Sequence, residues 1–109
     1  MIGFAKNLVS LVKSGEKVLT YRLGTKYANL QIGDKIKAKD SSTGKPFAEI
    51  EIIDKQVATF GELPINKLGH EEYQSKEEMK KTFQKYYDQE VSDDSPVIIL
   101  EFKLVKSVD

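Results

Sequence analysis

A long alternating segment, residues 47–59, is the feature that most limits how this chain can fold. Its apolar and polar side chains alternate with the period of two that turns one face of a β-strand toward a core. It follows a turn-rich stretch, residues 40–46, and an alternating strand at residues 35–39, so we predict that these two strands pair. Three isoleucines of the long segment are expected to supply core side chains: Ile50, Ile52 and Ile53.

The second half of the chain combines one helix with one apolar strand. Ser75-Lys76-Glu77-Glu78 is a capping box, which predicts a helix that begins after Ser75 and runs to about Asp88. Residues 96–106 form the most apolar run and are predicted to be a strand inside the sheet. The buried stripe of the helix is expected to consist of Met79, Thr82, Phe83 and Tyr86. Strands with helices beside them indicate the α+β class.

The first quarter of the chain predicts a helix followed by a strand. Apolar residues recur at helical spacing over residues 4–14, and Gly15 stands where a left-handed residue would end that helix. Residues 18–23 are rich in β-branched, aromatic and leucine side chains and are predicted to be a strand. A further short helix, interrupted near Pro64, is expected over residues 60–68.

Length and composition suit one domain over residues 1–109, because a chain of this size can bury about two thirds of its unfolded surface. There is no cysteine, and hence no disulfide framework or thiolate chemistry. Lys and Arg equal Asp and Glu in number, which argues against a protein that binds nucleic acid mainly by non-specific charge. The short apolar start predicts no signal peptide or membrane span and a cytoplasmic protein, with its oligomeric state left open.

Arg22 is the only arginine beside sixteen lysines, and it ends the octet of residues 15–22, Gly-Glu-Lys-Val-Leu-Thr-Tyr-Arg. A chain that otherwise uses lysine for positive charge is expected to need a planar guanidinium here, which can make two parallel hydrogen bonds to one ligand group. We therefore expect Arg22 to bind a ligand, and the octet to be part of the functional site.

The octet, written G-x-K-x-x-T-x-R, resembles the signature of the ASCH domain. The usual signature has Glu where this chain has Thr20, and threonine at that position is typical of the ASCH branch that hydrolyses N4-acetylcytidine. The resemblance implies a PUA-like, partly closed β-barrel of about five or six strands with two or three flanking helices. It further implies an amidohydrolase that releases cytidine and acetate, without metal or other cofactor.

The resemblance implies a catalytic arrangement of Thr20 as nucleophile, Lys17 as base and Glu72 as acid, with Arg22 orienting the substrate. Glu71 is the alternative acid if the register differs by one residue. A lysine acts as a base only where burial or a nearby cation lowers its pKa. Strict strand alternation would separate Lys17 from Thr20, so the arrangement requires Lys17 to lie in the turn before the strand.

Other residues have alternative interpretations. Tyr86 is expected in the core, and Tyr87 is expected to face the pocket and contact substrate. His70, the only histidine, has no metal-ligand spacing and is assigned no role. The alternating lysines of residues 35–39 suit a solvated sheet face. The alternative function is a non-catalytic RNA-binding module of the ASCH or PUA-like type, so the expected partner is a small nucleoside or RNA.

Overall fold

The computed structural model describes residues 1–67, 69–70 and 72–107, and over these residues one mixed sheet of five strands forms the centre of the protein. The strand order is β1-β3-β4-β5-β2; β1 is parallel to β3, and the other neighbours are antiparallel. The bounds are β1 Ile2–Phe4, β2 Leu19–Leu23, β3 Lys35–Asp40, β4 Pro46–Thr59 and β5 Pro96–Ser107. The predicted pairing of β3 with β4 and the internal position of β5 are both confirmed.

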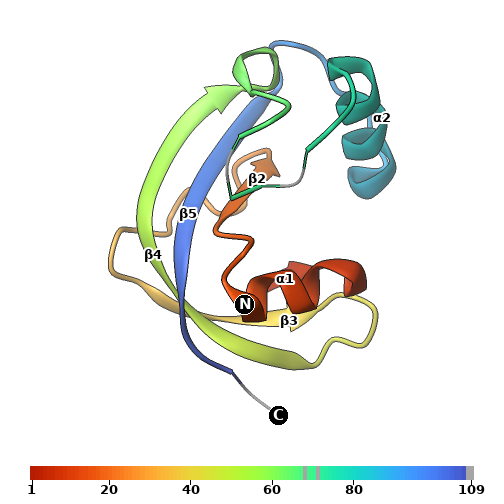
Figure 1. Cartoon of the computed structure of the whole chain (residues 1–109). Coiled ribbons are helices and arrows are strands. Elements are labelled where there is room, and N and C mark those ends of the chain that lie inside the picture. The colour runs from red at the N-terminus through yellow and green to blue at the C-terminus, as the bar shows by residue number, and fades with distance from the viewer. Residues whose placement is uncertain (68, 71, 108–109) are drawn as a thin grey trace.

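The two longest strands, β4 and β5, curve together into a half-barrel, and both helices lie on its concave side (Figure 1). The β4–β5 register shifts between Glu49 and Ile50 and between Ile52 and Asp54, as β-bulges do where a sheet bends. The second shift interrupts the inward alternation, so Ile50 and Ile52 are buried whereas Ile53 is exposed. The expectation that Ile53 supplies core is therefore wrong.

The N-terminal segment begins with a strand and not with the predicted helix. Phe4 belongs to β1, and the helical part is a 3-10 turn, η1 (Lys6–Leu8), followed by α1 (Val9–Ser14). Phe4 is buried against the rings of Phe47 and Phe102, so pairing and packing with distant strands override the local helical spacing. Gly15 ends α1 with a positive φ of 84°, as the sequence predicted.

The predicted capped helix is confirmed as α2 (Lys76–Tyr87), whose N-cap Ser75 accepts a hydrogen bond from the backbone N of Glu78 at 3.1 Å. A second 3-10 turn, η2 (Phe60–Glu62), is what the structure shows of the short helix expected over residues 60–68. Together the two α-helices and five strands of the described residues agree with the expected α+β class.

The inward face of α2 differs from the prediction at its last turn. Met79 and Phe83 are buried, as expected, but Tyr86 is 61% exposed, so its assignment to the core is wrong. Tyr87 is the half-buried tyrosine of the pair. One residue position is 100° around a helix, so the two neighbours cannot share one face, and packing selects Tyr87.

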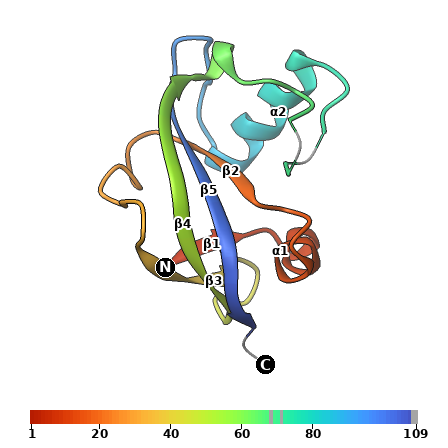
Figure 2. The same cartoon turned by 60° about the vertical axis from the view of Figure 1, so that its left-hand side comes forward.

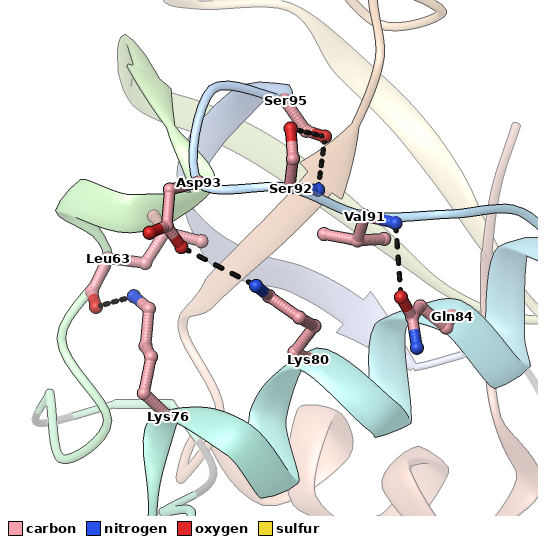
Figure 3. A network of polar contacts seen from close by, with 8 residues as sticks. All are labelled: Leu63, Lys76, Lys80, Gln84, Val91, Ser92, Asp93 and Ser95. Atoms are coloured by element: carbon pink, nitrogen blue, oxygen red, sulfur yellow. Dashed lines mark hydrogen bonds and ion pairs between the residues drawn. The ribbon is translucent and has the colours of Figure 1, made fainter.

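Polar contacts fix α2 to the segments that precede and follow it (Figure 3). The Lys76 ammonium donates to the Leu63 carbonyl and lies 4.7 Å from the centre of the Phe60 ring. Burial lowers the pKa of Lys76, and the Asp93 carboxylate acts in the opposite direction. Farther along the helix the Gln84 side chain accepts from the backbone N of Val91 at 3.2 Å. These contacts hold α2 against the segment before it and the segment after it.

Strand β2 contacts two hydrophobic clusters and contributes side chains to one of them. We call one the β1 cluster: Ile2, Phe4, Val12, Ala38, Phe47, Ala48, Ile50, Ile52, Ile98, Leu100 and Phe102. We call the other the α2 cluster: Tyr21, Leu23, Phe60, Leu63, Met79, Phe83, Val91 and Val97. Because side chains alternate along a strand, Tyr21 and Leu23 pack in the α2 cluster while Arg22 lies over Phe4 of the β1 cluster. Strand β2 runs between α1 and α2 (Figure 2). The two clusters therefore meet at this strand.

Candidate functional site

A cavity of about 270 Å³ lies where the two clusters meet. Strand β1 and the following turn contribute Phe4 and Leu8 to its wall, and α2 contributes Phe83 and its two terminal tyrosines. The octet singled out in the sequence contributes Tyr21 and three polar residues, Lys17, Thr20 and Arg22. The volume of this cavity lies just below the range of about 300–1,000 Å³ that is typical of small-molecule sites. The cavity therefore suits a small ligand with an apolar ring.

Lys17 and Thr20 are the two buried polar residues among the described part of the chain, each 4% exposed. Lys17 lies in the turn between α1 and β2, which is the position that the proposed arrangement required. Its Nζ donates to the carbonyl of Leu19 at 2.7 Å, directly before Thr20 in the chain. The structure thus brings the lysine side chain next to the backbone that carries the threonine.

Arg22 joins Thr20 to the aromatic part of the site. Its Nε donates to Thr20 Oγ1 at 2.8 Å, and its Cζ lies 4.9 Å from the centre of the Phe4 ring and 5.6 Å from that of Tyr27. Residues two apart on a strand share a face, which makes the Arg22–Thr20 contact possible. The positive guanidinium favours negative charge on the threonine oxygen.

Aromatic rings form the opposite part of the cavity wall. Tyr21 and His70 stack with their ring centres 4.0 Å apart, and Tyr73 lies 6.1 Å from His70 in a tilted arrangement. The Tyr87 hydroxyl accepts from the backbone N of Leu23 at 3.2 Å, so this predicted substrate contact also fastens α2 to β2. The Tyr21 and His70 rings pack against each other, so a planar ligand would contact the parts of these rings that line the cavity.

Gly69 holds the His70 segment against β2. The backbone N atoms of Val18 and Leu19 both donate to the Gly69 carbonyl, at 2.9 and 3.1 Å. Gly69 has φ +88°, and a Cβ built on it would lie 2.6 Å from Val18 Cγ2, so both conformation and space require glycine. The histidine next to it is thereby placed over Tyr21.

The predicted acid is not in the cavity wall. Glu72 is exposed, and it is not among the residues that line the cavity. Glu71, the alternative, lies outside the described residues. The structure therefore brings together Lys17, Thr20, Arg22 and Tyr87 of the predicted site, whereas Glu72 lies outside the cavity wall.

The sequence analysis missed His70 and Tyr73 as members of the site. Their placement depends on a stack across the fold and on the Gly69–Val18 contact, which no local spacing reveals. Within the described residues no group of three or more His, Cys, Asp or Glu side chains is arranged to hold a metal ion. Nor does any helix in that part of the chain have the length and apolar character needed to cross a membrane.

No family model and no curated protein matches this chain. Among solved structures, it is similar to an ASCH domain from Lactobacillus crispatus, with a TM-score of 0.70 and 17% identity over 95% of this chain and 80% of the other. A protein of Enterococcus faecalis gives a TM-score of 0.73 and 17% identity, over 99% of this chain and 83% of the other. A mutant ASCH protein from Zymomonas mobilis gives a TM-score of 0.65 and 11% identity, over 99% of this chain and 71% of the other. The chain therefore has the fold of the ASCH domain, a PUA-like α+β half-barrel.

Proposed function

We propose that this protein is an amidohydrolase that removes the acetyl group from N4-acetylcytidine, with Thr20 as its nucleophile. The observation that carries the proposal is the burial of Lys17 and Thr20 in the wall of one small, ring-lined cavity beside Arg22. A buried lysine and threonine on an open cavity wall serve no packing need that an apolar residue would not serve better. A chemical role for the two explains their presence.

In the proposed reaction Thr20 Oγ attacks the acetyl carbonyl carbon of the substrate. The bond from that carbon to N4 breaks, N4 takes up a proton and cytidine leaves. Water then hydrolyses the acetyl-threonine ester and releases acetate. The Arg22 guanidinium, 2.8 Å from Thr20 Oγ1, stabilises the negative charge that the oxygen acquires as its proton is removed.

Lys17 is the proposed base for that proton. Burial disfavours an ammonium relative to a neutral amine, and only the neutral amine can accept a proton. Lys17 Nζ donates to the Leu19 carbonyl at 2.7 Å, so the proposed base lies against the backbone directly before Thr20. The rate of hydrolysis is then expected to rise with pH and to level off below about pH 10.4, the ordinary lysine value.

Glu72 is retained as the proposed acid, with Glu71 as the alternative. Glu72 is exposed without substrate, but catalytic contacts often form only when substrate is bound. Glu72→Gln and Glu71→Gln variants identify the acid, because the one that supplies the proton to N4 loses turnover and the other keeps it. Loss in neither variant would remove the carboxylic acid from the mechanism.

The test is incubation of the purified protein with N4-acetylcytidine and chromatographic detection of cytidine. We expect cytidine from the wild type, a lower rate from Thr20→Ser, and none from Thr20→Val, which keeps the shape of the side chain without its hydroxyl. Thr25→Val is the matched control, because Thr25 is exposed and is not part of this cavity wall. Hydrolysis by Thr20→Val at the wild-type rate would contradict the covalent mechanism.

The alternative is a non-catalytic RNA-binding module. The exposed Lys35 and Lys37 of β3 favour it, because regularly spaced cations on a strand can contact phosphates. That function predicts RNA affinity that falls steeply as salt rises, with no release of cytidine from the acetylated nucleoside. Titration of RNA at two salt concentrations, beside the hydrolysis assay, separates the two functions.

A further inference from the structure

A second cavity, of about 290 Å³, adjoins the first on the side of β1 and β3. The two cavities share four wall residues: Gly3, Arg22, Ser41 and Tyr87. A ligand that fills the first cavity and extends past Arg22 therefore enters the second. The second cavity differs from the first in the charges that surround it.

Three cationic side chains line this second cavity: Arg22, Lys26 and Lys39. None of its lining residues in the described part of the chain is acidic. Lys26 Nζ lies 5.5 Å from the centre of the Tyr27 ring, and Arg22 Cζ lies 5.6 Å from the same centre. Cation–π contacts with this one ring therefore hold two of the three cations close together. An anion in this cavity would meet positive charge from strands β2 and β3 and from the loop between them.

Gly3 sets the distance between β1 and the residues that complete the wall. A Cβ built on Gly3 would lie 2.5 Å from Ser41 Oγ and 3.5 Å from Lys39 Cε. Glycine thus allows the Ser41 hydroxyl and the Lys39 stem to lie directly against the β1 backbone, where Gly3 pairs with Lys39. The hydroxyl adds a hydrogen-bond donor to the cations at the shared wall.

We propose that the second cavity binds a phosphate on the ribose of the ligand, so that the preferred ligand is a cytidine nucleotide and not the free nucleoside. The inference rests on the proposed function for the base in the first cavity. A nucleotide phosphate carries a charge of about −1.5 to −2 and three acceptor oxygens, which suit a guanidinium, two ammonium groups and a hydroxyl. The base stacks among the tyrosines, and Arg22 lies where the sugar passes from one cavity to the other.

The experiment compares the binding of cytidine and cytidine 5′-monophosphate by isothermal titration calorimetry, without any need for turnover. We expect the nucleotide to bind the wild type about ten- to a hundredfold more tightly, as charge-assisted hydrogen bonds to the phosphate would produce. Lys26→Gln and Lys39→Gln should each reduce that ratio several-fold, and the double variant should bring it near one. Lys45→Gln is the matched control, because Lys45 is exposed and is not part of either cavity wall.

A short single-stranded RNA that contains cytidine forms a second arm, since its phosphodiesters could also supply the phosphate. The proposed site is supported if the affinity for the nucleotide or for the RNA depends on Lys26 and Lys39. The ligand that shows this dependence is then the source of the phosphate. Equal affinities for nucleoside, nucleotide and RNA, or a preference that survives in the double variant, would overturn it. A protein that shows this lysine dependence but releases no cytidine from N4-acetylcytidine would refute the proposed function and leave the phosphate site standing.

Discussion

Replacing Thr20 by valine and Arg22 by lysine, separately and together, tests the contact on which the proposed chemistry depends. Valine keeps the shape of threonine and removes the acceptor oxygen. Lysine keeps the charge of Arg22 but not the Nε that donates to Thr20 Oγ1 at 2.8 Å. The double variant lacks both partners, so the free energies of unfolding of the wild type and the three variants together give the energy of the pair alone.

The structure sets the size of each effect. A hydrogen bond to a charged group contributes about 1.5–3 kcal/mol, and Thr20 is buried, so Thr20→Val should destabilise the protein by about that amount. Arg22→Lys loses the same bond and weakens the contacts of the guanidinium with the Phe4 and Tyr27 rings, which adds about 0.5–1 kcal/mol for each ring. We therefore expect Arg22→Lys to destabilise the protein by about 2.5–5 kcal/mol, and a coupling energy of about 1.5–3 kcal/mol.

Urea denaturation followed by circular dichroism measures these free energies. The comparison requires that the slope of the free energy of unfolding against urea concentration is the same in all variants. A surface arginine would tolerate lysine within about 0.5 kcal/mol. A coupling energy below about 0.5 kcal/mol would refute the reasoning, because Thr20 and Arg22 would then not act as a pair in solution.

Three further predictions concern Gly69, Tyr87 and Glu62. Gly69→Ala should destabilise the protein by about 1–3 kcal/mol, measured by urea denaturation, because its positive φ and the 2.6 Å approach to Val18 exclude a side chain; no loss would mean that this segment lies elsewhere. Tyr87→Phe should cost about 1 kcal/mol, because the Leu23 N loses its acceptor, whereas the exposed Tyr86→Phe should change stability by less than about 0.5 kcal/mol. Hydrogen bonds from Thr59 lower the pKa of Glu62, so the contribution of Glu62 to stability is present above about pH 4.5 and is lost as the pH falls through its lowered pKa in the folded protein. Glu62→Gln should therefore flatten the acid limb of a curve of stability against pH. An unchanged acid limb would contradict this.

The elements that the sequence predicted well are those whose signals are local. The capping box at Ser75 and the alternation of residues 47–59 each lie within one element, and both became the helix and strand expected of them. The contact between Thr20 and Arg22 was predictable for the same reason, since a strand places residues two apart on one face. Lys17 lies in the turn before β2, as the sequence analysis required, and it lines the same cavity.

The predictions that were wrong, and the residues that were missed, depend on contacts between distant parts of the chain. Phe4 is in a strand because β1 pairs with β3, and Ile53 is exposed because a bulge shifts β4 against β5. Tyr86 is exposed because α2 packs its neighbour Tyr87 against the α2 cluster. His70 joins the site only through its stack on Tyr21. None of these contacts leaves a periodic signal in the sequence.

Strand β2 has a consequence for how this protein can change in evolution. A deletion or insertion of one residue within it would exchange its two faces, moving Arg22 toward the α2 cluster and Tyr21 toward the β1 cluster. Such a change would bury the Arg22 guanidinium among apolar side chains and leave a cavity where the Tyr21 ring packs, so the variant would not fold. Selection can therefore alter the polar residues of this strand only by substitution at fixed length, while length variation is confined to the loops on either side.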